Sequence, residues 1–338
     1  MIRHRHAAPL DMAVIGAGPC GLAAGIAARR AQLSCVLFDK ECVAASISRY
    51  PTHMTFFSTA ERLEIGGVPF VVAGEKPSRR EALRYYQRLA REYRLDIHQY
   101  EPVRAITARG AGFDIETAHG AGGTARYRAR NVVIATGYFD SPNRLGIPGE
   151  DSPHVAHNYR EGHVFYDQDC VVIGGGNSAV DAALELNRWG ARVTLVHFAE
   201  QLDPNVKPWV RPEIDARIRD GDIAALFRAR VTEIRAEAVV VHGADGERTL
   251  DCDWVLAMTG YTPDGTLLRS LGVEFDPETG IPHHHPGTME TNVPGVFIAG
   301  VLAAGFNANK VFIENGRDHG DHIVARVKSR VDTLREPG

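Results

Sequence analysis

The chain has 338 residues, of which 44% are hydrophobic and 24% charged, and this is typical of a globular protein long enough for about two domains. Its formal net charge of -4 argues against a nucleic-acid partner, and no apolar run approaches the roughly 18 residues of a membrane-spanning helix. The first ten residues lack an apolar core of signal-peptide length, so we expect a cytoplasmic protein with no nucleic-acid or membrane partner.

The chain begins with alternating strand and helix patterns. Apolar runs predict strands over 12–15 and 34–38, and the segment between them, about 21–33, has a helical pattern. A mostly irregular stretch follows over 42–77. Such a long irregular stretch inside a compact domain is usually functional.

The first half of the chain continues with a helix, a meander and a strand, and the second half repeats the alternation of strands and helices. Residues 78–95 predict an amphipathic helix, 102–131 a small β-meander and 132–138 a buried strand. The second half contains a strand before Gly174, a helix over about 178–189, a strand over 192–197, short strands over about 229–251 and a strand over 254–261. We assign the last strand, 295–300, and a helix over about 310–330 to the first domain, because the second unit already has its closing strand.

Two glycine-rich turns carry the strongest signal in the sequence. They are Gly16-Ala-Gly18-Pro-Cys-Gly21 and Gly174-Gly-Gly176-Asn-Ser-Ala179, and each follows an apolar strand. In G-x-G-x-x-G/A the first glycine allows the tight turn, the second lets the backbone approach a pyrophosphate, and the small third residue lets helix and strand pack. The pyrophosphate would lie at the positive end of the helix dipole. Two such motifs predict an electron-transfer enzyme in which a nicotinamide nucleotide reduces a flavin.

These repeats define the expected fold. The segments 132–138 and 255–261 match each other, as the two glycine turns do. The sequence therefore predicts an α/β fold with two Rossmann-like dinucleotide-binding domains, the second inserted into the first. We expect an FAD-binding domain at residues 1–158 and 265–338, and an NAD(P)H-binding domain at 159–264.

The residue at the end of the second strand distinguishes the two sites. An acidic residue about 20 positions after the first glycine binds a ribose diol, and Asp39 has this place in the first motif. His197 has the same place in the second motif, where an acid would repel a 2′-phosphate and a histidine does not. The sequence therefore favours NADPH over NADH at the second site. Lys207 and Arg211 in the next loop could supply the positive charge.

The motifs, together with Ala135-Thr-Gly137 and Thr291-x-x-Pro-Gly-Val-x-x-Ala-Gly300, resemble the two-dinucleotide flavoprotein disulfide reductases. The small thioredoxin-reductase-like branch fits best, because no dimerisation domain of about 100 residues follows. The chain departs from thioredoxin reductase in lacking the C-x-x-C of that family's nicotinamide domain.

A closer resemblance is to the YpdA family of bacillithiol disulfide reductases. The matching stretches are 16–24, 50–58, 63–66, 166–169, 207–209, 303–309 and 312–317. The resemblance implies that the cysteine inside the first glycine motif, here Cys20, is the redox thiol. Related flavoproteins commonly have an aspartate that contacts the flavin after the last strand. Here Val301 replaces it, and this replacement matches the YpdA-like pattern.

Cys20 lies in the first turn of the predicted helix. The helix dipole there stabilises a thiolate and lowers the pKa of the thiol, whereas the charge of a nearby pyrophosphate raises it again. A thiolate is the species that attacks a disulfide. The alternative is that Cys20 only fills a small space. With no second cysteine nearby, we expect a mixed disulfide with substrate or a thiolate–flavin contact.

The remaining candidate site residues are expected to handle protons or to bind the two cofactors. His53 and His157 are candidates for proton handling near the flavin, since a histidine titrates near neutral pH. The alternative for each is a hydrogen-bonded loop histidine without a catalytic role. The five cysteines and the tract His283-His-His285 show no metal-site spacing, so no metal is expected. The expected cofactor-binding residues are Gly16, Gly18, Pro19, Gly21, Asp39, Lys40, His53, Thr55, Val103, Thr136, Gly137, Gly174, Gly176, Asn177, Ser178, Ala179, His197 and Gly300.

The sequence thus predicts an FAD-containing, NADPH-dependent oxidoreductase that reduces a low-molecular-weight disulfide of the bacillithiol type. Two other classes remain open: a flavin monooxygenase, which the stretch 148–159 distantly resembles, and a redox-responsive sensor that acts by binding alone. We also expect a homo-oligomer, a dimer or larger.

Overall fold

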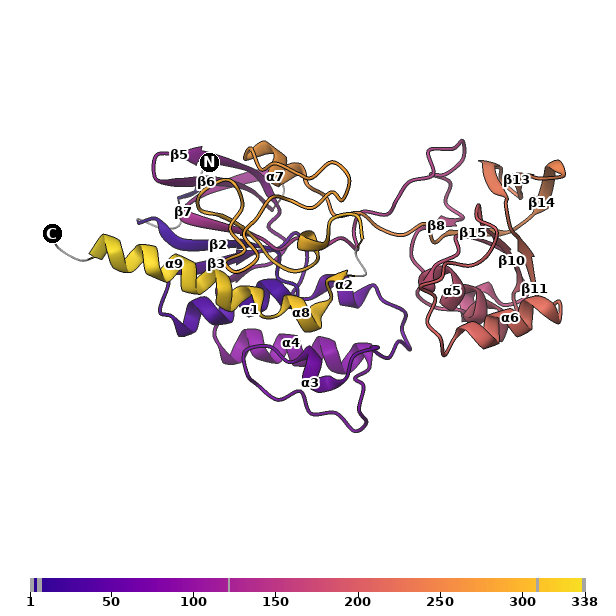
Figure 1. Cartoon of the computed structure of the whole chain (residues 1–338), viewed down its shortest axis with the longest axis horizontal. Coiled ribbons are helices and arrows are strands. Elements are labelled where there is room, and N and C mark those ends of the chain that lie inside the picture. The colour runs from indigo at the N-terminus through magenta and orange to yellow at the C-terminus, as the bar shows by residue number, and fades with distance from the viewer. Residues whose placement is uncertain (1–2, 5–7, 121, 308–309, 336–338) are drawn as a thin grey trace. The chain divides into compact units, whose positions relative to one another are not determined.

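A computed structural model describes residues 3–4, 8–120, 122–307 and 310–335, so the last two residues of the stretch 303–309 lie outside the described residues (Figure 1). The chain forms two compact units. The first comprises Met1–Ser48, His53–Ser141 and Thr262–Gly338. The second comprises Arg49–Thr52 and Pro142–Tyr261.

The first unit is built on one mixed sheet. Its parallel part consists of β4, β3, β2, β7 and β16 in that order across the sheet. The bounds are Leu10–Ile15 for β2, Cys35–Phe38 for β3, Ile97–His98 for β4, Gly123–Ile134 for β7 and Val296–Ile298 for β16. All six residues of β2 are buried, as expected for a central parallel strand with both faces covered.

The predicted meander and the buried strand after it share one long strand. The first part of β7 pairs antiparallel with β6 (Gly112–His119), which pairs with β5 (Val103–Arg109). The last residues of β7 pair in parallel with β2 and β16. Exposed and buried residues alternate along the first part, and the last four residues are all buried. The sequence separated these parts because their hydrophobic patterns differ, although the backbone is continuous.

Helices cover the sheet of the first unit (Figure 1). The main ones are α1 (Pro19–Arg30), α4 (Arg79–Glu92) and α9 (His319–Arg335). A β-carbon on Gly320 would lie 2.7 Å from the backbone of Ala24, so α9 and α1 pack backbone to backbone. The remaining short elements of this unit are β1 (Arg3–His4), α2 (Ala45–Ser48), α3 (Ala60–Leu63), α7 (Thr266–Ser270), η2 (Gly300–Ala304) and α8 (Ile313–Gly316).

The second unit repeats the parallel plan with fewer strands. Its five-stranded parallel sheet has the order β11-β10-β9-β15-β8, and a three-stranded antiparallel sheet has the order β12-β13-β14. The strands are β8 (Val155–Ala156), β9 (Asp169–Ile173), β10 (Arg192–Val196), β11 (Ile223–Leu226), β12 (Arg230–Ile234), β13 (Ala238–Gly243), β14 (Gly246–Asp251) and β15 (Trp254–Ala257). The helices are η1 (His163–Phe165), α5 (Asn177–Arg188) and α6 (Arg211–Arg219).

The order β9–α5–β10 reproduces β2–α1–β3 and confirms the predicted α/β fold with two Rossmann-like units, one inserted into the other. The unit boundaries differ from residues 158 and 264, because β8 pairs with β15 and so draws the segment from Pro142 onward into the second unit. The backbone N–H of Thr52 also donates to the carbonyl of Arg160, which explains why 49–52 belongs to the second unit.

Within the described part of the chain, no helix is both long enough and apolar enough to cross a bilayer.

Candidate functional site

The three small residues of the first glycine turn have separate physical roles. Gly16 has a φ of +113°, and a β-carbon there would lie 2.3 Å from the carbonyl oxygen of Ala135. A β-carbon on Gly21 would lie 2.0 Å from the carbonyl oxygen of Gly16. No described atom lies within 4 Å of a β-carbon placed on Gly18. Packing inside the protein thus explains Gly16 and Gly21, whereas the open space beside Gly18 fits a ligand.

In the second turn, too, the first glycine is required by packing and the second has open space beside it. Gly174 has a φ of +139°, and a β-carbon there would lie 2.4 Å from the carbonyl oxygen of Met258 and 3.2 Å from the β-carbon of Ala179. The space around a β-carbon on Gly176 is again free of described atoms within 4 Å. Each turn therefore leaves room at its second glycine, where the motif requires a close approach to pyrophosphate.

The helices that follow these turns are also suited to an anion. Neither α1 nor α5 has an acidic residue in its first turn or a side chain that caps its N-terminus. By contrast, α4 begins with a capping box in which Ser78 and Glu81 satisfy each other's backbone N–H groups. The N-terminal N–H groups of α1 and α5 are therefore available to a phosphate group.

Asp39 is fixed at the end of β3, beside the first glycine turn. Its carboxylate accepts the backbone N–H of Ala17 at 2.7 Å and that of Glu41 at 2.8 Å. Burial raises the pKa of Asp39, and these two hydrogen bonds oppose the shift. Each carboxylate oxygen keeps a further lone pair, so Asp39 can accept a ribose hydroxyl as its position predicts.

Other residues predicted to contact the flavin lie at or near the ends of β3 and β7. The backbone N–H of Glu101 donates to the carbonyl of Asp39 at 2.8 Å, which brings the start of β5 at Val103 near the end of β3. Lys40 pairs with Asp140 at 3.0 Å and so links the loops after β3 and β7. Thr136 follows β7, and its buried hydroxyl has no hydrogen-bond partner among the described residues. An unsatisfied buried hydroxyl fits a polar ligand at this place.

The remaining candidates of the first unit differ in their surroundings. Gly137 has a φ of +73°, with no described atom within 4 Å of an added β-carbon. His53 and Thr55 are exposed on the irregular stretch, where Thr55 bridges to Ser78. The backbone N–H of Gly300 donates to Nδ1 of His319 at 3.1 Å.

In the second unit, Asn177 organises the turn. Its amide group donates to the carbonyl of Asn205 at 3.1 Å and accepts the backbone N–H of Lys207 at 3.0 Å. The loop that contains Asn205 and Lys207 is thereby fixed against the N-terminus of α5. Ser178, the next residue of the motif, is exposed.

His197 lies directly on the second glycine turn. A β-carbon on Gly175 would lie 2.5 Å from the His197 ring, and the residue is only 7% exposed. Its Nδ1 has no hydrogen-bond partner within the described ranges. Burial lowers the pKa of His197, and the Arg230 charge lowers it further while Asp203 opposes both. The ring is therefore neutral at neutral pH.

The two cations expected near the second site are already paired. Lys207 Nζ contacts Asp181 at 3.1 Å, and Arg211 Nε contacts Asp215 at 2.9 Å. The arginine beside His197 is instead Arg230, at the start of β12. Spacing from the glycine motif could not reveal it, because β12 belongs to the separate antiparallel sheet.

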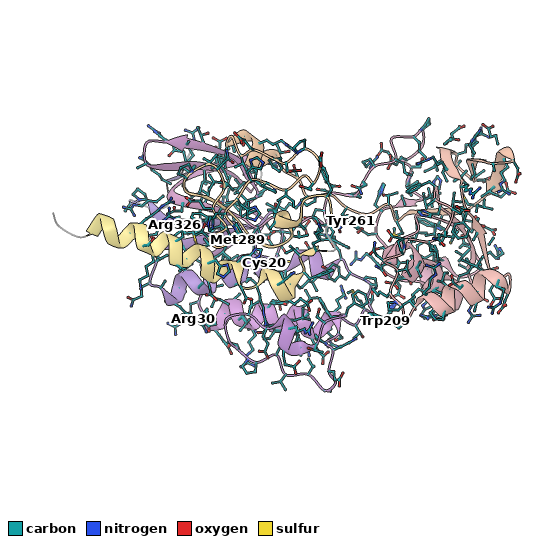
Figure 2. The ribbon with its side chains drawn as sticks, in the orientation of Figure 1. Cys20, Arg30, Trp209, Tyr261, Met289 and Arg326 are labelled. Carbon is teal, nitrogen blue, oxygen red and sulfur yellow. The ribbon has the colours of Figure 1, made fainter. Side chains whose placement is uncertain are left out.

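Cys20, labelled in Figure 2, lies in the first turn of α1, and its Sγ lies close to Gly300 and Gly316 of the C-terminal part of the first unit. A β-carbon on Gly300 would lie 3.0 Å from Sγ of Cys20, and one on Gly316 would lie 2.9 Å from it. The thiol is thus packed against the backbone of η2 and α8. Both neighbours are glycines, and a side chain at either position would crowd the sulfur atom of Cys20.

Of the opposing effects expected on the pKa of Cys20, the one that raises it is larger in this structure. Burial raises the pKa of the Cys20 thiol to about 12. Cys20 is only partly exposed, and the loss of hydration outweighs the effect of the helix dipole on its thiol. Cys20 is therefore a neutral thiol at neutral pH.

We expect slow alkylation of Cys20 by iodoacetamide. A pKa near 12 in place of 9.0 leaves about 10³-fold less thiolate than a free cysteine has at pH 8. Peptide mass spectrometry after timed alkylation measures the rate, with free cysteine as the reference. The rate should continue to rise with pH above 9, and a plateau near that pH would contradict the burial effect.

The remaining histidines of interest, His157 and the tract His283-His-His285, have different surroundings. His157 is half-buried in the second unit, burial lowers its pKa, and neither ring nitrogen has a hydrogen-bond partner in the described residues. His283 pairs with Glu274 at 3.3 Å, whereas His284 contacts the carbonyl of Pro282 at 2.7 Å. No group of three His, Cys, Asp or Glu within 3–4, 8–120, 122–307 and 310–335 is arranged to hold a metal ion.

Two Rossmann-like units with open glycine turns define the chain as a two-dinucleotide-binding flavoprotein by its fold. Residues 13–300 match the pyridine nucleotide-disulphide oxidoreductase family. The chain is 47% identical over 319 residues to the bacilliredoxin reductase Bdr of Bacillus subtilis, covering 94% of this chain and 97% of that protein.

Solved structures agree with this assignment. The bacillithiol disulfide reductase Bdr (YpdA) from Bacillus cereus is 44% identical, with a TM-score of 0.93 over 96% of this chain and 100% of the other. The thioredoxin reductase of T. acidophilum, at 23% identity and a TM-score of 0.75 over 96% of this chain and 99% of the other, shares the fold. The chain therefore belongs to the pyridine nucleotide-disulphide oxidoreductase family and, within it, to the YpdA-like group, as the sequence motifs predicted. Membership implies an oxidoreductase that uses a flavin and a nicotinamide nucleotide and acts on a disulfide.

Proposed function

We propose that this protein is an FAD-containing, NADPH-dependent reductase of a low-molecular-weight disulfide of the bacillithiol type, and that it works as a homo-oligomer. The observation that carries the cofactor part is the pair of glycine turns, each open at its second glycine. The substrate class rests on the similarity to the Bdr proteins, whose names specify bacilliredoxin or bacillithiol disulfide.

The first unit would hold FAD and the second NADPH. The N-terminus of α1 and Gly18 would bind the FAD pyrophosphate, and Asp39 would bind the ribose. Thr136 would supply a hydroxyl that has no hydrogen-bond partner among the described residues. The N-terminus of α5 would bind the pyrophosphate of NADPH. When bound, FAD accepts hydride from NADPH and passes the electrons on.

Cys20 would perform the thiol chemistry. Its Sγ attacks one sulfur of the substrate R–S–S–R, a mixed disulfide forms, and the first R–SH leaves with the proton of Cys20. Two electrons and two protons then release the second R–SH and restore the thiol. Because burial raises the pKa of Cys20, removal of its proton must accompany the attack. Overall, NADPH, one proton and R–S–S–R give NADP⁺ and two R–SH.

Stopped-flow absorbance tests this function. The flavin is reduced with NADPH and then mixed separately with bacillithiol disulfide, glutathione disulfide, a quinone and oxygen. We expect bacillithiol disulfide to reoxidise it fastest. Fast oxygen uptake coupled to substrate hydroxylation would indicate a monooxygenase instead, and the absence of turnover with every acceptor would indicate a sensor.

The nucleotide preference can be tested at His197. His197→Asp should raise the KM for NADPH by roughly 10-fold or more, since a carboxylate there repels the 2′-phosphate and binds a ribose diol. FAD content should stay unchanged, because the FAD motif belongs to the other unit. Steady-state kinetics with NADPH and NADH, and the flavin absorbance, provide the measurements.

His197→Asn is the matched control for this prediction. Asparagine has nearly the shape of aspartate without its charge, so it reproduces any loss of packing on Gly175. Equal effects of the two variants would show that packing and not charge matters at this position. Equal wild-type turnover with NADH and NADPH would contradict the preference itself.

A further inference from the structure

The second nucleotide site needs a positive charge that its own glycine motif does not supply. A 2′-phosphate carries nearly two negative charges at neutral pH and is best held by a guanidinium group. His197 stands where the ribose hydroxyls are bound in this fold, but its ring is buried and neutral. Lys207 and Arg211 are engaged by Asp181 and Asp215. An arginine that no described carboxylate pairs with is therefore better suited to bind this phosphate.

The segment that leads into the antiparallel sheet brings two arginines, Arg228 and Arg230, to this place. The backbone N–H of Ala229 donates to the carbonyl of His197 at 3.1 Å, and that of Arg228 donates to the carbonyl of Ala199 at 2.8 Å. These two hydrogen bonds fix the entry to β12 alongside residues 197–199. Arg228 and Arg230 are consequently neighbours of the strand end that meets the ribose.

The two arginines differ in what they already bind. Arg228 pairs with Glu200 and so neutralises an acid that would otherwise repel a phosphate. Arg230 lies over the ring of Phe198, with its guanidinium carbon 4.6 Å from the ring centroid. Across the described ranges of the chain, no carboxylate pairs with Arg230. Arg230 is thus charged, oriented and free to bind an anion.

Phe198 connects this arginine to the glycine turn. Its ring centroid lies 4.7 Å from that of His197, which in turn packs on Gly175. Phe198 is 58% exposed, so the pair that it forms with Arg230 lies at the protein surface. Stacking on an aromatic ring restricts a guanidinium and lowers the entropy lost when it binds a ligand.

We infer that Arg230, held on Phe198 beside His197, binds the 2′-phosphate of NADPH and sets the preference for NADPH over NADH. This inference rests on the proposed use of NADPH and names the residue that determines it. The neutral ring of His197 lies beside Arg230 without adding charge. Its Nδ1, which has no hydrogen-bond partner in the described part of the chain, can accept or donate a hydrogen bond.

Calorimetry with nucleotide fragments tests the inference on the FAD-loaded protein without turnover. The probes are 2′,5′-ADP, which carries the 2′-phosphate, and 5′-ADP, which lacks it. Arg230→Ala should raise the Kd of 2′,5′-ADP by about 10- to 100-fold, the range of one hydrogen-bonded charge pair, and change that of 5′-ADP less than two-fold. Arg230→Lys should give an intermediate loss for 2′,5′-ADP, because it keeps the charge but not the planar fork.

Arg248→Ala is the matched control. Arg248 is an exposed arginine on β14, across β13 from β12, so its removal changes net charge equally at a distance from His197. It should alter neither affinity. Unchanged 2′,5′-ADP binding in Arg230→Ala, with a clear wild-type preference for 2′,5′-ADP, would overturn the role of Arg230 alone. A wild type that binds both fragments equally would overturn the NADPH preference, and the inference with it.

Discussion

Replacing Cys20 by serine should lower disulfide turnover by on the order of 10³-fold or more, because a hydroxyl is a far poorer nucleophile than a thiol or thiolate. FAD content should remain near that of wild type. Serine is slightly smaller than cysteine and fits between Gly300 and Gly316, where a bulkier side chain would not. Reduction of the flavin by NADPH should also persist, since hydride transfer does not need the thiol.

Three measurements separate lost chemistry from a lost cofactor. Flavin absorbance reports FAD content, stopped-flow reduction by NADPH reports the first half-reaction, and steady-state turnover with bacillithiol disulfide reports the second. Cys42→Ser is the matched control, because Cys42 is another free cysteine of the first unit that lies outside the glycine turn. It should leave all three unchanged.

Unchanged disulfide turnover in Cys20→Ser would also be informative, because Cys20 is closely packed against two glycines. If Cys20→Ser reduces disulfides at the wild-type rate, the residue only fills the space beside Gly300 and Gly316. Electrons would then leave the flavin without a protein thiol. A thiol with a pKa near 12 is consistent with that alternative, so the turnover measurement decides between the two roles.

The sequence revealed the features that depend on local spacing. Both glycine turns, the helices after them and Asp39 at the end of β3 follow from short motifs whose geometry repeats across this fold. The family resemblance rests on the same kind of evidence, extended over several motifs. Such features are predictable because the residues that create them are neighbours in the chain.

Features that depend on distant segments could not be predicted. The pKa of Cys20 is raised by burial, and its Sγ lies against Gly300 and Gly316, which η2 and α8 bring to α1 from the far end of the chain. Arg230 reaches His197 only because β12 begins beside the end of β10. The unit boundary shifts to Pro142 because a two-residue strand, β8, pairs with β15. None of these contacts has a sequence pattern of its own.

Replacing Gly18 by valine should reduce FAD retention to less than about a tenth of that of wild type, because the side chain would enter the space required by the pyrophosphate. The protein itself should tolerate the change. Gly18 has a φ of −73° and a ψ of 178°, which any residue adopts, and no described atom lies within 4 Å of an added β-carbon. The free energy of unfolding of the flavin-free protein should therefore fall by only about 1 kcal/mol, the cost of a poorer N-cap residue on α1.

Two glycine variants make the comparison specific. Gly74→Val, in an open loop of the same unit with no described atom within 4 Å of its β-carbon, should retain flavin fully. Gly16→Ala should instead destabilise the protein even without flavin, since its β-carbon would lie 2.3 Å from a backbone oxygen and its φ is +113°. Flavin absorbance after gel filtration and thermal unfolding of the flavin-free proteins measure these effects. A Gly18→Val protein that keeps one FAD per chain would show that the pyrophosphate lies elsewhere, whereas one that loses both flavin and stability would show that Gly18 serves packing as Gly16 does.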